Sequence, residues 1–143
     1  MKVSSLITGK TVLTISSQAT LLELVEKLTA YKVGALVVSP DGKKIDGIIS
    51  ERDVVTAIPI HMKDLESLHV RDLMTTQVHT ATGETPIVEL MELMTQQRIR
   101  HVPIVDSNEQ LISIISIGDV VKAHVTEIDD ERHALIDYVH NPR

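Results

Sequence analysis

The chain has 143 residues, of which 43% are apolar, a formal net charge of −6 and no cysteine. This length is typical of one compact domain that buries a hydrophobic core. The negative charge argues against a nucleic-acid backbone as partner, and the lack of cysteine excludes disulfides and thiolate chemistry. No apolar run approaches a membrane span and Met1–Lys10 does not resemble a signal peptide, so we expect a soluble, cytoplasmic protein with no membrane partner.

In the first half of the chain the pattern predicts a strand, a helix, two strands and a second helix. The helix carries apolar residues at helical spacing, and a Pro-Asp-Gly-Lys turn separates the two later strands. Pro59 is expected to end the second helix. The expected elements are a strand at 12–15, a helix at 21–31, strands at 35–39 and 45–50, and a helix at 51–58.

The second half of the chain repeats this order. Gly47–Val55 (GIISERDVV) returns as Ser113–Val121 (SIISIGDVV), an offset of 66 that holds without a gap from position 12 to position 57. Such self-similarity indicates two copies of one structural unit. In the second copy, Thr85 and Pro86 are expected to open the first helix, with Pro86 in the first helical position. Its strand pair is expected at 102–106 and 111–116.

The last segment continues at helical spacing past the end of the second unit. Its apolar positions form one stripe, which needs a surface to cover it. That surface is expected to be either the N-terminal segment or a second subunit. The stripe consists of Val121, Val125, Ile128, Leu135 and Val139.

Each unit alone would be a thin sheet with helices on one face. We therefore expect an α/β (α+β) fold in which two βαββα repeats pack about a pseudo-twofold axis into one module. The expected division is residues 1–66 for the first repeat with the N-terminal segment, 67–125 for the second repeat, and 126–143 for an extended C-terminal helix.

Each repeat places a serine and an aspartate where a strand turns into a helix: Ser50 with Asp53, and Ser116 with Asp119. A serine followed three residues later by an acid is close to a helix capping box, which is one interpretation. A helix N-terminus also favours a phosphate, and a nearby carboxylate accepts the two hydroxyls of a ribose. The pattern is compatible with both functions and does not choose between them.

These corners, with the RIRHVPIVD strand, resemble those of a tandem pair of CBS domains, a Bateman module, here expected as a stand-alone CBS-domain protein. The resemblance covers about residues 3–125. The family pattern of glycine, an apolar residue, any residue, Ser or Thr, two residues and Asp is met in full after Gly47, whereas Ser113 replaces the glycine in the second copy.

The resemblance implies a non-catalytic regulatory module that binds an adenine nucleotide in a cleft between the repeats. In the family, the aspartate holds the ribose and the serine lies near the phosphate, and the ligands include AMP, ADP, ATP, S-adenosylmethionine and NAD(H). No cofactor is required. The resemblance also implies a homodimer, since Bateman modules commonly pair into flat dimers, and an unknown regulated protein as partner.

Basic residues distinguish the two corners. Arg100 and His101 lead into a strand of the second repeat, where the first repeat has Gly34 and Ala35. They are candidates for phosphate contacts, similar to basic residues at this place in AMP-sensing relatives, or they are exposed charges at a helix end. Arg52 lies inside the first corner and is a candidate for bidentate phosphate binding.

Other candidates contact the base or the sugar. In the family the base is read largely by backbone groups, here near the first strand and at Val102 and Pro103. Thr14 and Thr80 match across the repeats and are candidates for hydroxyl contacts, although strand propensity explains them equally well.

Two other chemistries rank lower. Asp129, His133 and Asp137 share one face of the last helix, but this spacing is ordinary charge pairing on a helix, so we expect no metal site. No nucleophile and base are tied together by the sequence, so we expect no catalysis. The alternative to a nucleotide sensor is an interaction or scaffold protein whose serine and aspartate corners serve only as caps.

Overall fold

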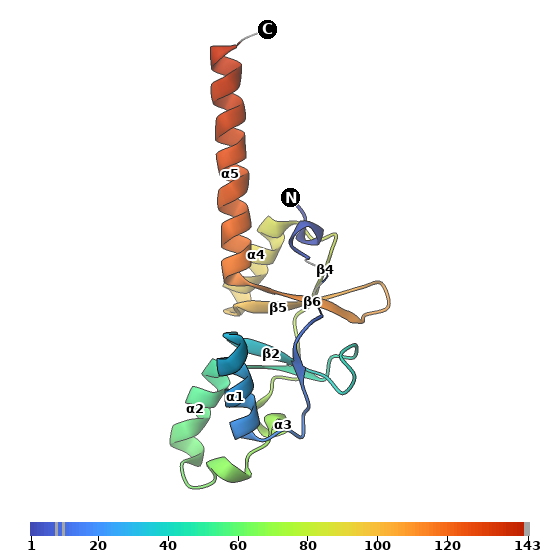
Figure 1. Cartoon of the computed structure of the whole chain (residues 1–143), viewed down its shortest axis with the longest axis vertical. Helices are drawn as coiled ribbons and strands as arrows, with labels where there is room; N and C mark the ends of the chain where they lie inside the picture. The colour runs from blue at the N-terminus through green and yellow to red at the C-terminus, as the bar shows by residue number, and fades with distance from the viewer. Residues whose placement is uncertain (8, 10, 142–143) are drawn as a thin grey trace.

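The computed structural model describes residues 1–7, 9 and 11–141 of the chain (Figure 1). The elements follow the predicted order in both repeats, with short helical segments before each one. In chain order they are η1 (Val3–Leu6), β1 (Thr14–Ile15), α1 (Leu21–Tyr31), β2 (Ala35–Val38), β3 (Gly47–Ser50), α2 (Glu51–His61), η2 (Leu65–Ser67), α3 (Val70–Leu73), β4 (Ala81–Thr82), α4 (Ile87–Gln97), β5 (His101–Val105), β6 (Leu111–Ser116) and α5 (Ile117–His140).

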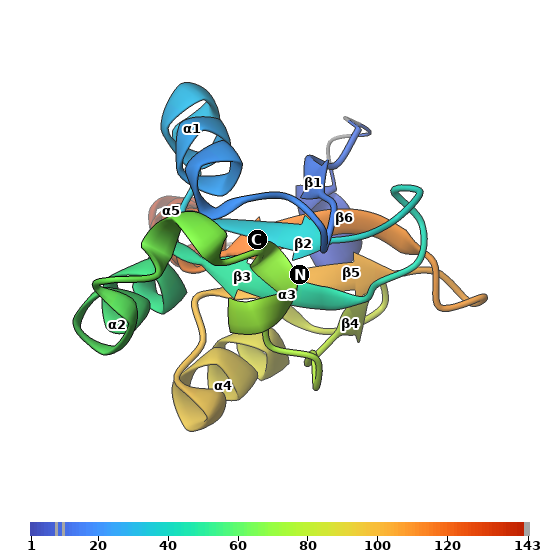
Figure 2. The same cartoon turned by 90° about the horizontal axis from the view of Figure 1, so that it is seen from below.

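Two three-stranded mixed sheets form the centre of the molecule, with helices around them (Figure 2). The sheet orders are β1-β2-β3 and β4-β5-β6, and in each sheet the short first strand pairs parallel while the hairpin pairs antiparallel. The strand register repeats with the offset seen in the sequence, which confirms the predicted α/β pair of repeats. The pairs Ile15–Val38 and Ala35–Ser50 in one sheet correspond to Ala81–Ile104 and His101–Ser116 in the other.

The two repeats exchange the segments that precede them. Val3, from the N-terminal segment, is fully buried in the core of the second repeat, whereas Val70, from the segment between the repeats, is buried in the core of the first. The N–H of Val3 donates to the carbonyl oxygen of Thr85 (2.8 Å), and the N–H of Val70 donates to that of Ala19 (2.9 Å). The N-terminal segment, which the sequence division groups with the first repeat, therefore packs in the second.

Equivalent left-handed residues end the first helix of each repeat. Lys32 after α1 and Arg98 after α4 have φ values of 53° and 55°. Such a residue stops a helix and turns the chain sharply. The turn after α4 sends Arg100 and His101 into the start of β5.

Two predicted helix boundaries were wrong. Helix α2 continues through Pro59 to His61, although Pro59 removes the N–H that would bond to the carbonyl oxygen of Val55. Val55 is 65% exposed, so water can bond to this carbonyl oxygen and the helix tolerates the proline. Pro86 is the N-cap of α4 and lies one residue before the first helical position, because its extended ψ of 143° keeps it outside the helix.

Helix α5 is the longest element, and it runs without a break from the second corner through the predicted C-terminal helix, from Ile117 to His140. Its first turns pack on the second repeat through Val120 and Ala123, and its second half stands clear of both repeats (Figure 1). Among the described residues, no helix has the length and apolar character needed to cross a bilayer.

Candidate functional site

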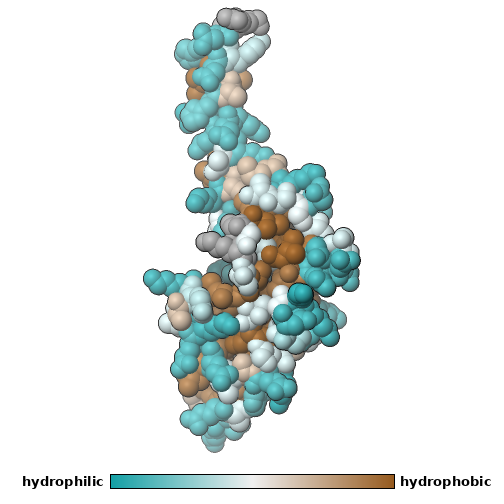
Figure 3. Space-filling view, turned by 45° about the vertical axis from the view of Figure 1, so that its right-hand side comes forward, coloured by the Kyte–Doolittle hydropathy of each residue, from teal (hydrophilic) through white to brown (hydrophobic). Residues whose placement is uncertain are grey.

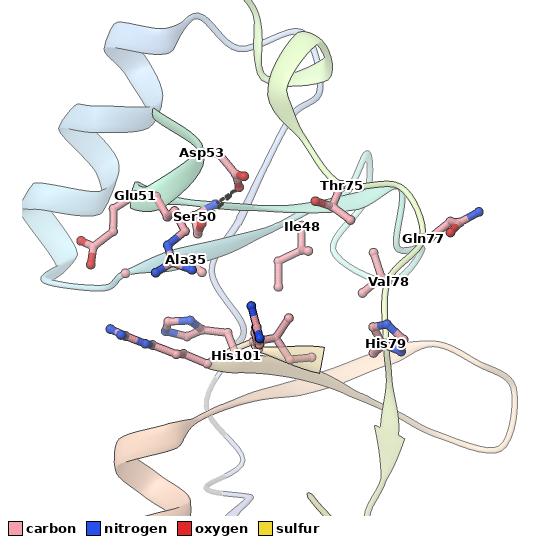
Figure 4. Close-up of a pocket in the computed structure, with 15 residues that line it drawn as sticks. Ala35, Ile48, Ser50, Glu51, Asp53, Thr75, Gln77, Val78, His79 and His101 are labelled. Atoms are coloured by element: carbon pink, nitrogen blue, oxygen red, sulfur yellow. Dashed lines mark hydrogen bonds between the residues drawn. The ribbon is translucent and has the colours of Figure 1, made fainter. Parts of the chain in front are cut away.

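A cavity of about 270 Å³ lies between the two repeats. One wall comes from the end of β3 and the start of α2, the opposite wall from the chain entering β5, and the third from the segment that leads into β4 (Figure 4). The volume is close to the lower end of the range of small-molecule sites, about 300–1,000 Å³. The lining residues are Gly34, Ala35, Ile48, Ser50, Glu51, Arg52, Asp53, Thr75, Gln77, Val78, His79, Arg98, Ile99, Arg100 and His101.

The first wall carries the Ser50 and Asp53 corner. The backbone N–H and the hydroxyl of Ser50 both donate to Oδ2 of Asp53, at 2.8 and 3.1 Å (Figure 4). The corner is thus a helix cap, as one interpretation of the sequence predicted. Both bonds use one carboxylate oxygen, and Asp53 is only half-buried, so the carboxylate still faces the cavity.

The opposite wall concentrates positive charge. Arg98, Arg100 and His101 come from the second repeat and face Arg52, at the N-terminus of α2, from the first. The N-terminus of a helix adds a partial positive charge. The cavity therefore combines a carboxylate that can accept hydroxyls with a cationic region that can bind an anion.

His101 lines the cavity and lies against Gly34. A Cβ atom on Gly34 would meet Cε1 of His101 at 3.2 Å, so glycine gives the imidazole its room. Burial lowers the pKa of His101 below its usual value; the carboxylates of Glu51 and Asp119 oppose this shift, and Arg100 adds to it. The lowered pKa favours the neutral ring, and an anion placed beside it would favour its protonation.

The third wall is the segment between the repeats. Thr75 pairs with Ile48 of β3 through two backbone hydrogen bonds, each of 2.9 Å. This close approach requires a glycine at position 47, since a Cβ atom there would lie 2.8 Å from the carbonyl oxygen of Thr75. The glycine in the Gly47 motif thus allows the segment to close the cavity.

The second corner has the same backbone plan. The N–H and hydroxyl of Ser116 donate to Oδ2 of Asp119, both at 2.9 Å, and the N–H of Asp119 donates back to Oγ of Ser116 at 3.3 Å. The pseudo-twofold relation places Lys32, Gly34 and Ala35 at the positions that Arg98, Arg100 and His101 occupy for the first corner. Asp119 is exposed.

The structure brings five of the predicted site residues together. All five line the one cavity: Ser50, Arg52, Asp53, Arg100 and His101. The sequence assigned Arg100 and His101 to the repeat that contains Asp119, and the structure places them opposite Asp53. A ligand held by Asp53 would therefore contact both repeats.

The other six predicted residues lie outside the described lining of this cavity. Val102 is fully buried in the core of the second repeat, and Pro103 is also buried. Thr14 is half-buried, and its carbonyl oxygen accepts a hydrogen bond from Nζ of Lys27, while Thr80 is exposed. Ser116 and Asp119 form the second corner.

Sequence reasoning missed part of the lining. Thr75, Gln77 and His79 reach the cavity because the segment between the repeats passes along it. The available signal was the match of Val3 with Val70 at an offset of 67, which shows that equivalent segments precede both repeats. Arg98, the left-handed residue that ends α4, was also missed.

A metal site is not indicated in the described residues, 1–7, 9 and 11–141. They contain no group of three or more His, Cys, Asp or Glu side chains placed to hold an ion. Asp129, His133 and Asp137 lie along the exposed half of α5.

The fold and the cavity define a module of two repeats with equivalent strand-to-helix corners. The sequence profile of the CBS domain matches the chain twice, at residues 3–60 and 70–126. The chain therefore belongs to the CBS-domain family and contains a tandem CBS pair, or Bateman module.

Relatives of known sequence or structure agree with this assignment. The chain is 39% identical over 124 residues to the mitochondrial CBS domain-containing protein CBSX3 of Arabidopsis thaliana, a match that covers 84% of this chain and 60% of the plant protein. It is similar to the CBS-domain protein ATU1752 of Agrobacterium tumefaciens, with 35% identity, a TM-score of 0.81, and coverage of 87% and 99% of the two chains.

A further similar structure contains a ligand. The CBS domain protein PAE2072 of Pyrobaculum aerophilum, described as complexed with AMP, is 26% identical with a TM-score of 0.75, and the match covers 83% of this chain and 89% of that one.

Proposed function

We propose that this chain is a non-catalytic regulatory module that binds an adenine nucleotide in the cavity beside Ser50 and Asp53. The observation that carries the proposal is the composition of this cavity: a carboxylate corner from one repeat faces Arg98, Arg100 and His101 from the other. The AMP complex of the similar Pyrobaculum protein supports the same ligand class.

The Asp53 carboxylate is the proposed ribose ligand. Its Oδ2 atom already accepts two hydrogen bonds from Ser50, which fix the orientation of the carboxylate. A carboxylate oxygen has room for further donors, so two sugar hydroxyls can add to a group that is already positioned. Capping and ligand binding are then functions of the same residue.

The phosphate is expected between Arg52 and the wall formed by Arg98 and Arg100. Guanidinium groups bind phosphate in a bidentate manner, and the N-terminus of α2 supplies a partial positive charge to the same region. Arg52 and Arg100 are exposed at the cavity, which leaves them free to reorient around a ligand.

The base is expected against aliphatic side chains, because the chain has no Phe or Trp and its tyrosines, Tyr31 and Tyr138, are exposed. Ile48, Val78 and Ile99 supply apolar lining in the cavity. We still expect backbone groups to recognise the base, near the first strand and near Val102 and Pro103. The hydroxyls of Thr14 and Thr80 remain candidates for further contacts.

Nucleotide binding would act on a partner through the relative position of the repeats. The cavity takes residues from both repeats and from the segment between them, so a ligand that contacts all three favours one arrangement. A ligand changes a conformational equilibrium only through its different affinity for the two states. The regulated protein is unknown.

Calorimetric titration of the protein with AMP, ADP, ATP, NADH and adenosine tests the proposal. We expect binding with one strong site per chain and a higher melting temperature in the presence of the ligand. Purified protein also reports a retained ligand by its absorbance at 260 nm, because two tyrosines and no tryptophan absorb weakly at 280 nm. If no adenine nucleotide binds to the ligand-free protein or raises its melting temperature, the scaffold alternative is correct. In that alternative both corners are only helix caps.

A further inference from the structure

The cationic end of the cavity also contains a carboxylate. Glu51 is the first residue of α2 and lines the cavity together with three arginines. Among the residues that the structure describes, no basic group lies within ion-pairing distance of the Glu51 carboxylate. This negative charge therefore remains available to act on a ligand. The three arginines are Arg52, Arg98 and Arg100.

The carboxylate of Glu51 lies close to the imidazole of His101. Both groups flank Gly34, since a Cβ atom there would lie 3.5 Å from Oε1 of Glu51 and 3.2 Å from Cε1 of His101. Burial lowers the pKa of His101, and Glu51 opposes this shift more than any other charge does. Figure 4 shows Glu51 at the same end of the cavity as His101 and away from Gln77. Glu51 is thus placed in the region where the phosphate is expected.

The equivalent position in the second repeat is apolar. The N–H of Glu51 donates to the carbonyl oxygen of Gly34 at 2.9 Å, and the N–H of Ile117 donates to that of Arg100 at 2.8 Å. The side chain of Ile117 is half-buried and packs against the second core. An acid in the first turn favours the helix dipole, but Asp53 already supplies one to α2. The backbone at this position therefore does not require a carboxylate.

The fixed charges at this end of the cavity match one phosphate group. The arginines carry three positive charges and Glu51 cancels one of them, so two remain in excess. Asp53 does not enter this balance, because it is the proposed ribose ligand. A phosphate monoester carries a charge of about −1.5 to −2 at pH 7. A single phosphate would therefore neutralise the region, and every further phosphate would add negative charge near Glu51 without a matching cation.

We propose that Glu51 makes the cavity selective for a nucleoside monophosphate over the corresponding di- and triphosphates. This inference rests on the proposed nucleotide site and names the residue that limits the number of phosphates. Like charges repel across a binding interface and disfavour the wrong ligand. Because the Glu51 side chain is exposed, solvent weakens this repulsion, and we expect a graded preference without complete exclusion.

The size of the cavity favours the same class of ligand. Its volume of about 270 Å³ is small beside the range of roughly 300–1,000 Å³ that is usual for small-molecule sites. A nucleoside placed against Ile48 and Val78 would fill much of this space. Little enclosed volume would then remain for a chain of phosphates.

Calorimetric titration with adenosine, AMP, ADP and ATP tests the selectivity. The buffer contains no magnesium, since a divalent cation would mask the phosphate charges. In the wild type we expect the affinity to fall from AMP to ADP to ATP. Glu51→Gln removes the charge and keeps the size of the side chain. It should raise the affinity for ATP about 10-fold and that for AMP only about 2-fold, with no change for adenosine.

Two variants control for other effects of the substitution. Glu51→Asp keeps the charge and should keep the preference for AMP. Glu131→Gln removes the same charge from the projecting half of α5, whose surface is mostly polar in Figure 3, and should leave all the affinities unchanged. Thermal melting of the ligand-free variants reports any loss of the helix-dipole interaction, which would affect all the ligands alike.

The possible failures of the inference and of the nucleotide site are distinguishable. Wild-type protein that binds ATP as tightly as AMP would overturn the selectivity and leave the site in place. The same holds if Glu51→Gln keeps the wild-type ratio of AMP to ATP affinity, or if Glu131→Gln changes that ratio equally. S-adenosylmethionine carries no phosphate, so tighter binding of this ligand than of AMP would overturn the proposed ligand class. Absence of binding by all four adenine compounds would overturn the nucleotide site itself and the inference with it.

Discussion

The corners at Asp53 and Asp119 have the same backbone and different surroundings. Each aspartate accepts the N–H and hydroxyl of a serine three residues earlier. Arg98 and Arg100 face the first corner across the repeat interface, whereas Lys32 and Gly34 take the equivalent positions for the second. Duplication thus conserves the cap, and the residues of the opposite repeat determine which corner is suited to an anionic ligand.

The largest expected effect comes from removing the carboxylates. Asp53→Ala should weaken AMP binding about 100-fold or more, because two charge-assisted hydrogen bonds to the ribose are lost. Asp119→Ala removes an equivalent cap and serves as the matched control, with a similar loss of stability of about 1 kcal/mol and little change in AMP affinity. Calorimetry and thermal melting measure the two effects. Equal AMP binding by both variants and the wild type would show that Asp53 is only a cap.

The arginines of the opposite wall should distinguish phosphate from nucleoside. Arg100→Ala is expected to weaken AMP binding about 10- to 100-fold and to leave adenosine binding unchanged, because one charge-assisted contact to the phosphate is lost. Lys32→Ala, at the end of α1 in the other repeat, should leave AMP affinity near that of wild type. An equal loss for AMP and adenosine would indicate that Arg100 shapes the cavity and does not bind the phosphate.

Glycine at position 47 and serine at position 113 provide a stability comparison. Gly47→Ala places a Cβ atom 2.8 Å from the carbonyl oxygen of Thr75. We expect a loss of about 1–3 kcal/mol and a melting temperature several degrees lower, because backbone must move. Ser113→Ala adds no atom and should cost less than about 1 kcal/mol. If both variants melt alike, the contact with Thr75 does not constrain position 47.

The smallest expected effect is a pH dependence through His101. Its pKa is lowered by burial in the free protein, and a bound phosphate favours the protonated ring, so binding should take up a proton. AMP affinity should rise a few-fold from pH 8 to about 6.5, the usual pKa of histidine, while adenosine affinity stays constant. His101→Gln should remove the dependence, and titrations in buffers of different ionisation enthalpy measure the proton directly.

The lowered pKa of His101 also makes the free protein less stable in acid. Because the folded state holds the His101 pKa below its unfolded value, the unfolded chain binds more protons as the pH falls below about 6.5. Stability contributed by the neutral ring is present above that pH and is lost on acidification. Urea unfolding of wild type and His101→Gln at several pH values separates this contribution from the other histidines.

Local patterns predicted the elements well. The helix at 21–31 matches α1, because Thr20 and Glu23 form a capping box and its apolar residues recur at helical spacing. The corners also followed from the sequence, since a capping box is local. Pro59 was misjudged because tolerance of a proline depends on whether the freed carbonyl reaches water, and that is a property of the folded surface.

The assembly of the cavity could not be read from either repeat alone. Arg100 and His101 line the same cavity as Asp53 only through the packing of the two repeats, and Thr75 pairs with Ile48 only because the connecting segment crosses back over β3. These contacts join residues far apart in sequence, which local periodicity does not report.

The exchanged segments set an order for folding during synthesis. The first repeat takes Val70 into its core, so it cannot complete that core until the chain has been made beyond α3. Val3 comes first in the chain among the residues of the second core, but it cannot be buried until β4 to β6 and the start of α5 have been made. The earliest part of the chain is therefore among the last to find its place, and contacts of such long sequence separation slow folding.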